Sequence, residues 1–342
     1  MKVGKALLSW IVAAILAFLI VNAICFLYER PVGWIDTPNG ASLSIRRPGS
    51  IIVRGLEGYG ITQVDDNGYI NPDKPLNDSY ILMMGASHTQ GKEIRSELKY
   101  SYLVNEMIAE DSEFLSTYNI GCERNFLPTL LGHFKAAISE YPNASCITIE
   151  IGDTDYSGDE IREAMEQFDN IEASSISAEE YFDQADLLLK IKNVVKEYIP
   201  ILSLIKNKLE TAKEYDVQIE ATEESTEFDY KEYQDELYNA LLRVRQEYDG
   251  PIVFLYHPNI KLNEDGSLEI IRSKTWEIFR ETCQRVDIDC VDLGNDFLEE
   301  FQKTFQVPYG FHNTTLGSGH LNVTGHRIIA DAIMEYIGGI RK

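Results

Sequence analysis

The chain has 342 residues and carries 31 Lys and Arg against 55 Asp and Glu, which gives a formal charge of -24 at pH 7. This acidity excludes nucleic acid as the main ligand, because phosphate recognition needs a basic surface, whereas a neutral sugar or an ester is compatible with it. The five cysteines show no Cys-x-x-Cys spacing and the six histidines are not spaced as metal ligands, so we expect no metal and no cofactor.

The chain opens with an apolar segment. Residues 6–28 contain only Ser9 and Asn22 as polar interruptions and are long enough to cross a bilayer as a helix. A cleaved signal peptide is the alternative, since residues 21–23 have small residues at the cleavage spacing. The apolar run continues beyond them to Leu27, which favours an uncleaved anchor within residues 1–28 that contacts the lipid bilayer through residues 6–28.

Residues 29–78 are rich in Gly, Pro and Asn, with short β-like stretches at Ser50 to Arg54 and Gly60 to Val64. A turn is expected at residues 66–68. We interpret this segment as a juxtamembrane stalk that becomes a small β-flap packed on the following domain. No residue in it is expected to take part in chemistry.

The first stretch that suggests chemistry is Ser79 to Gly91, SYILMMGASHTQG. Its strand, Tyr80 to Met84, has no charge, which is typical of a parallel sheet covered by helices on both faces. Ligands of such sheets bind beyond the carboxyl ends of the strands, where Ser87 would lie. A plain strand-to-helix turn is the alternative. Thr89 stands where the Gly-x-Ser-x-Gly elbow would need its second Gly, so that elbow is excluded.

A second stretch lies near the C-terminus, where Gly317 to His326 reads GSGHLNVTGH. The next residues, 327–337, have helical apolar spacing. Asn322 or Thr324 would cap that helix, which puts His320 in the loop just ahead of it. Between the two stretches, Ser116 to Gly121 and Cys146 to Asp155 each indicate a strand that ends in a turn.

Taken in order, these four blocks resemble those of the SGNH/GDSL hydrolases. The resemblance implies that Ser87 is the nucleophile and His320 the general base. It also implies an oxyanion hole formed by the amides of Ser87 and Gly121, with Thr154 in the position of the family's Asn. Further residues expected on the substrate side are His88, His257, Asn259 and Asn322.

The chain departs from the family's pattern at the orienting acid. Gly317 occupies the place where the family has an Asp, three residues before the His. We therefore predict that a main-chain carbonyl of residues 316–318 accepts the second ring proton of His320.

Strands and helices alternate along the remaining chain, as in an α/β fold. This alternation, with the resemblance, predicts a flavodoxin-like sandwich around a parallel five-stranded sheet, formed by residues 79–342. The predicted helices are Glu97 to Ala109, Leu127 to Glu140, Tyr233 to Tyr248 and Leu268 to Val286, and the later strands are Ile252 to Tyr256 and Cys290 to Leu293.

An insertion is expected at about residues 157–230. Ser177 and Glu180 form a candidate capping box, and apolar residues recur at helical spacing from Leu187 to Leu209 with lysines among them, including Lys208. We interpret this pattern as a helical pair that covers one side of the sheet. The alternatives are a lid, or a basic amphipathic surface that rests on the membrane or on a partner. Glu214 to Glu236 is strongly acidic and is expected to be a linker or a helix start.

The resemblance implies a membrane-anchored, extracytoplasmic serine esterase or O-acyltransferase. Its expected substrate is an acyl ester, in particular an acetyl ester, of a cell-surface glycan, and a membrane-bound O-acyltransferase is a possible partner. The alternative is a catalytically impaired module that binds a glycan or such a partner. Hydrolysis and acyl transfer share the acyl-enzyme, so the sequence does not separate them.

Overall fold

The computed structural model describes residues 2–37, 39–71, 79–111, 116–206 and 228–340. Its centre is a five-stranded sheet in which every neighbouring pair is parallel, in the order β11-β8-β7-β5-β6. The strands are β5 (Tyr80–Met84), β6 (Ser116–Asn119), β7 (Ala144–Ile151), β8 (Ile252–Tyr256) and β11 (Asp289–Asp292). All residues of β5 and β8 are buried, as expected for central strands covered on both faces.

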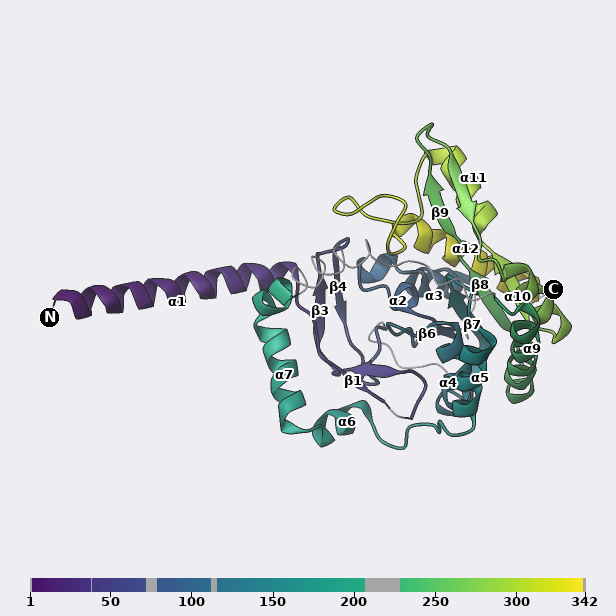
Figure 1. The fold of residues 1–342 in the computed structure, drawn as a ribbon, viewed down its shortest axis with the longest axis horizontal. Helices are drawn as coiled ribbons and strands as arrows, with labels where there is room; N and C mark the ends of the chain where they lie inside the picture. Colours follow the sequence, from purple (N-terminus) through teal and green to yellow (C-terminus); the bar gives the residue numbers. More distant parts are fainter. Residues whose placement is uncertain (1, 38, 72–78, 112–115, 207–227, 341–342) are drawn as a thin grey trace.

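Helices cover both faces of this sheet, as Figure 1 shows. One apolar core joins the sheet to α4 (Leu127–Glu140), α5 (Gly158–Phe168), α9 (Tyr230–Glu247) and α10 (Trp276–Arg285). A second core on the opposite face contains side chains of α3 (Tyr100–Asp111), α11 (Gly294–Thr304) and α12 (Val323–Ile340). The predicted α/β sandwich with a parallel five-stranded sheet is confirmed.

The N-terminal part has two elements, a long helix and a flap. Helix α1 (Lys2–Tyr28) projects from the body of the molecule in Figure 1 and is the one described helix that is long and apolar enough to cross a membrane. The flap contains two antiparallel pairs, β1 (Trp34–Asp36) with β2 (Ser44–Arg46) and β3 (Ile51–Arg54) with β4 (Gly60–Gln63). A small apolar cluster of its own, which includes Val32 and Ile52, holds it together.

One predicted helix is wrong in its first part. Instead of a helix from Leu268 to Val286, the chain forms a hairpin of β9 (Asn259–Leu262) and β10 (Leu268–Ile271), and α10 starts only at Trp276. The turn at Asn263 to Gly266 closes this hairpin, with Gly266 at a φ of 81°. Residues 268–271 of the predicted helix are thus a strand, and its residues 276–285 are helical.

The expected insertion is a chain of helices. The capping box of Ser177 and Glu180 is present and starts α6 (Ala178–Gln184), which is followed by α7 (Leu187–Tyr198). The prediction that this pair covers the sheet is wrong for α7, because its apolar side chains, such as Leu188, are exposed and the helix lies against the flap and α1. Lys208, Leu209 and residues 214–227 of the acidic stretch lie outside the described residues.

Candidate functional site

Ser87 is the first residue of α2 (Ser87–Gln90), a single turn that follows the carboxyl end of β5. Glu150 of the neighbouring strand β7 holds this turn in place. One oxygen of this carboxylate accepts hydrogen bonds from the amide of Ala86 at 3.0 Å and from the hydroxyl of Thr89 at 2.7 Å. Because Ala86 and Thr89, one before and one after Ser87 in this turn, share one buried carboxylate, the Ser87 backbone is held in place.

The other oxygen of Glu150 contacts His257 Nε2 at 2.5 Å, and Tyr309 contacts His257 Nδ1 at 2.8 Å. Burial by itself would raise the pKa of Glu150, but the charge and hydrogen bond of His257 outweigh it and lower this pKa to about 2. Our prediction that His257 lies on the substrate side is wrong, since the side chain is buried and both ring nitrogens have protein partners. His257 instead supports the carboxylate that holds the Ser87 turn.

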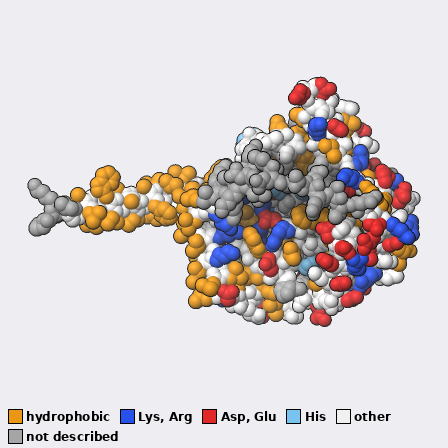
Figure 2. All heavy atoms as spheres, in the orientation of Figure 1, with side chains coloured by type: hydrophobic (Ala, Val, Ile, Leu, Met, Phe, Trp, Pro, Cys, Tyr) orange, Lys and Arg blue, Asp and Glu red, His pale blue; other side chains and the backbone are white. Residues whose placement is uncertain are grey.

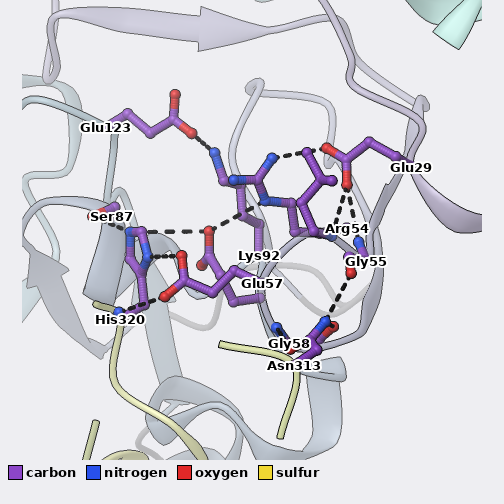
Figure 3. Close-up of polar contacts among 12 residues, drawn as sticks. Glu29, Arg54, Gly55, Glu57, Gly58, Ser87, Lys92, Glu123, Asn313 and His320 are labelled. Carbon is purple, nitrogen blue, oxygen red and sulfur yellow. Dashed lines mark hydrogen bonds and ion pairs between the residues drawn. The ribbon is translucent and has the colours of Figure 1, made fainter. Parts of the chain in front are cut away.

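His320 lies in the loop before α12 and contacts Ser87. Its Nε2 is 3.0 Å from Ser87 Oγ, although the two residues are 233 positions apart in the chain. Its Nδ1 is 2.6 Å from Glu57 Oε2, and its backbone amide donates to Glu57 Oε1 at 2.8 Å. Figure 3 shows the imidazole between the serine and the carboxylate. The structure therefore places the Ser87 hydroxyl and the Glu57 carboxylate at the two nitrogens of the His320 imidazole.

Glu57 comes from the flap, in the loop between β3 and β4. Asn313, in the loop ahead of His320, brackets this flap loop by accepting from the Gly58 amide at 2.9 Å and donating to the Gly55 carbonyl at 2.9 Å. Gly319, with a φ of 85°, permits the close approach, because a Cβ at this position would collide with Glu57 Oε1. Two predictions are thus corrected: a carboxylate and not a main-chain carbonyl contacts Nδ1, and the flap contributes to the site.

The contact changes the protonation of both partners. Burial would raise the pKa of Glu57, but its hydrogen bonds to His320 and the charge of the imidazolium outweigh this and lower that pKa. Burial would lower the pKa of His320, but the hydrogen bond to Glu57 and the charges of Glu93 and Glu57 outweigh it, so the pKa is raised. Glu57 is therefore an ionised acceptor, which favours the proton on Nδ1 and leaves Nε2 to accept one from Ser87.

Glu93 is a second carboxylate at the site and is almost fully buried. Its Oε1 is 4.0 Å from His320 Nε2 and 3.9 Å from Arg54 Nε, and it accepts no hydrogen bond from any residue that the structure describes. Ligand atoms of Glu57, Glu93 and His320 lie within 4.8 Å of one another, a spacing at which a cation could bind. The 2.6 Å contact between two of them is that of a hydrogen-bonded pair.

The three expected oxyanion donors, from Ser87, Gly121 and Thr154, differ in whether they already have acceptors. The amide of Gly121 already donates to Asn119 Oδ1 at 2.8 Å. The amide of Thr154 donates to Ser273 Oγ at 3.1 Å, and its hydroxyl is paired with that of Thr275 at 2.9 Å in a fully buried position. The predicted roles of Gly121 and Thr154 are therefore corrected, because both amides have acceptors inside the protein and the Thr154 hydroxyl, which accepts from Thr275, is fully buried. The Ser87 amide has no acceptor among the described residues.

The remaining predicted residues do not all face the site. His88 lies between the two other imidazoles, with ring centroids 5.2 Å from His320 and 4.6 Å from His257, and its Nδ1 accepts from the Leu321 amide. Burial, followed by the charge of His257, holds the pKa of His88 well below its usual range. It is therefore a neutral neighbour of the base.

Asn322 is structural, because its oxygen accepts from the Thr324 amide at the start of α12 and its nitrogen donates to two carbonyls. The substrate-side prediction for it is wrong, and its role as the cap is confirmed. Asn259 is the exposed first residue of β9, and among the described residues no hydrogen bond joins it to Ser87, so its place on the substrate side stays a prediction.

Sequence reasoning missed Glu57 and Glu150. Glu57 stands in a Gly-rich loop with no local feature that distinguishes it from other flap carboxylates. Glu150 had a signal that we did not use: it is the only charged residue inside the apolar strand CITIEI, and a charge at a buried position of a central strand implies a partner.

Several solved structures are similar to this chain. No protein-family model matches the chain, and no curated protein matches it. One similar structure is LAE5, an alpha/beta hydrolase enzyme from the metagenome of Lake Arreo, with 16% identity and a TM-score of 0.41 over 76% of this chain and 95% of that one.

A second is CEX, a two-domain esterase active on acetylated mannans, with 12% identity and a TM-score of 0.39 over 77% of this chain and 50% of that one. A third is a member of the lipolytic protein G-D-S-L family from Veillonella parvula, with 11% identity and a TM-score of 0.35 over 75% of this chain and 97% of that one. At such low similarity we base the function on the geometry around Ser87.

Proposed function

We propose that the protein is a serine ester hydrolase or acyltransferase of the SGNH type, with Ser87 as nucleophile, His320 as general base and Glu57 as the residue that orients the base. The observation that supports this is the position of one imidazole, 3.0 Å from a serine hydroxyl on one side and 2.6 Å from a carboxylate on the other. This arrangement is the one that nucleophilic serine catalysis requires, whatever the order of its members in the chain.

In the proposed reaction, Ser87 Oγ attacks the acyl carbon of an ester while His320 Nε2 takes the hydroxyl proton. The imidazolium that forms is stabilised by the Glu57 carboxylate at Nδ1. His320 then gives the proton to the departing alkoxide, and the acyl group remains on Ser87. A water molecule or a sugar hydroxyl, deprotonated by the same nitrogen, releases the acyl group and regenerates the serine.

The oxyanion of the tetrahedral intermediate needs donors near Ser87. The Ser87 amide is our candidate, since it has no acceptor among the described residues and belongs to a turn that Glu150 fixes. The predicted second and third donors of the sequence resemblance have other partners, so the hole relies on fewer fixed donors than the family pattern implies.

The finer assignments rest on the sequence resemblance. We propose that α1 is an uncleaved anchor, that the domain is extracytoplasmic, and that the substrate is an acetyl or other acyl ester of a cell-surface glycan, with a membrane-bound O-acyltransferase as partner in the case of transfer. Recovery of a membrane-bound protein whose N-terminus is Met1 would support the anchor; a soluble form that begins near Ile24 would refute it.

The alternative of an impaired binding module drew on Gly317 and Thr154. Since a carboxylate from the flap contacts His320, the missing family Asp no longer favours that alternative. The test is turnover of a small acetyl ester by the full chain and by Ser87→Ala and His320→Ala. We expect both variants to lose turnover and to remain folded, because each side chain is half-buried and little core volume is removed. Wild-type turnover in either variant would refute the assignment.

A further inference from the structure

A cavity of about 750 Å³ lies between the flap and α7. Its wall is apolar on two sides, with Val32, Trp34 and Ile52 from the flap and Leu189 and Val195 from α7. Ser87 and His320 are not among its lining residues, so it is separate from the candidate active site.

Basic side chains also face this cavity, although the protein as a whole is strongly acidic. Lys196 Nζ lies 3.6 Å above the ring of Trp34, and Arg46 Cζ lies 5.5 Å from the centre of the same ring. Lys192 is a further lining residue. Burial, and then the neighbouring charges of Arg46 and Lys192, lower the pKa of Lys196 to about 7. Cations that repel one another in a partly buried place would be stabilised by a bound anion.

The three acids of the wall pair with other cations. Glu29 pairs with Arg54 at 2.8 Å, Asp36 with Arg124 at 3.5 Å, and Glu123 with Arg46 at 3.4 Å and with Lys92. Within the described part of the chain, no carboxylate forms an ion pair with Lys192 or Lys196. Lys192 and Lys196 of the cavity thus have no carboxylate partner in its wall.

The exposed apolar side chains of α7 indicate where the ligand comes from. They form a row with helical spacing that continues along helical residues 200–206 and consists of Leu187, Leu188, Ile191, Val194, Tyr198, Leu202 and Ile205. Three of them, Leu188, Ile191 and Leu202, also line the cavity, so the row borders its opening. Hydrophobic side chains line the side of the body from which α1 projects (Figure 2), and α7 runs crosswise to α1 at its inner end (Figure 1).

Contacts fix this crosswise arrangement. The Asn22 side chain of α1 donates to the Tyr198 carbonyl at 2.9 Å, and the rings of Phe26 and Tyr198 stack with centroids 6.5 Å apart. The buried Glu197 of α7 contacts Arg30, just after α1, at 2.6 Å. If α1 crosses a membrane, the membrane surface is perpendicular to the α1 axis. Because α7 runs crosswise to α1, α7 lies along that surface. The exposed row of α7 then rests in the interface.

We propose that the cavity between the flap and α7 binds an anionic lipid from that membrane, with its phosphate beside Lys192, Lys196 and Arg46 and its acyl chain along the apolar wall. A membrane-facing helix, an apolar cavity beside it and lysines without carboxylate partners at that cavity each fit this one ligand class. The site does not depend on the proposed esterase activity.

The test uses the purified full chain in a neutral detergent and follows its Tm. Dihexanoyl phosphatidylglycerol, dihexanoyl phosphatidylcholine and inorganic phosphate are added in separate titrations. A ligand that binds the folded state raises the Tm in a concentration-dependent way. We expect a rise of several degrees with the anionic lipid and no comparable rise with the other two. An equal rise with phosphatidylcholine, or the whole rise with phosphate alone, would overturn the proposal.

Two variants sharpen the test. Lys192→Gln with Lys196→Gln removes the two lysine ammonium groups of the cavity and should abolish the rise in Tm with phosphatidylglycerol. Lys190→Gln with Lys231→Gln changes the net charge equally outside the cavity and should keep it. If the first variant does not fold, Ser203→Trp, which fills part of the cavity, replaces it with the same expected loss. A wild-type response in the folded cavity variant would refute the assigned phosphate site.

Discussion

Replacement of Glu57 by Gln tests the part of the site that comes from the flap. The amide keeps the size of the side chain but removes the charge that faces the imidazolium during the reaction. At an effective dielectric constant of 20, two unit charges about 4 Å apart interact by about 4 kcal/mol. That energy corresponds to about 10³ in rate, and breaking the equivalent contact in the serine-protease template costs about 10⁴. We expect kcat to fall by roughly 10³ to 10⁴ in Glu57→Gln.

The pH profile separates this role from a structural one. The pKa of His320 is raised by its surroundings, so wild-type kcat/KM should fall with decreasing pH at a pH above the ordinary His value of about 6.5. Without the Glu57 charge, the acidic limb should move to lower pH. Asp66→Asn, an exposed carboxylate of the same flap, is the control and should change neither rate nor profile. A Glu57→Gln variant with wild-type kcat and profile would refute the assigned role.

Two further predictions follow from the same contacts. Gly317→Asp, which restores the family acid in the sequence, should not raise the esterase rate, because Glu57 already contacts Nδ1 of His320 and the φ of 82° at Gly317 would strain an Asp. A several-fold gain in rate would show that the site lacks a working acid. Burial, and then the charge of Lys99, lowers the pKa of His326 to about 3. Between pH 6.5 and 3 the unfolded state therefore binds a proton that the folded state does not. The free energy of unfolding should decrease as pH falls through that window, by up to about 1.4 kcal/mol per pH unit. Urea unfolding at several pH values measures this, and an unchanged slope in His326→Gln would contradict it.

The sequence predicted the fold well where the signal is local. The uncharged strand before Ser87 and the alternation of strands with helices indicate a parallel sheet without any knowledge of contacts. It failed at residues 268–271, which were predicted to start a helix but pair with residues 259–262 in a hairpin closed by the turn at Asn263 to Gly266. In that segment strand pairing, a tertiary property, decided between two local patterns.

The site was predicted only in part, for a related reason. Ser87 and His320 stand in turns that follow or precede regular elements, and such positions can be recognised in sequence. Glu57 and His320 are 263 positions apart, and what joins them is the docking of the flap loop against the loop of Asn313. Likewise the spacing of α7 predicted a helix, but the face that it exposes depends on α1 and the flap.

The central claim is that Ser87 is an activated nucleophile. Intact-mass measurement of the full chain after reaction with a fluorophosphonate, followed by peptide mapping, tests it most directly. We predict one adduct, on Ser87, that is absent in Ser87→Ala and forms much more slowly in Glu57→Gln. No adduct on the folded wild type, or an adduct that persists in Ser87→Ala, would contradict it.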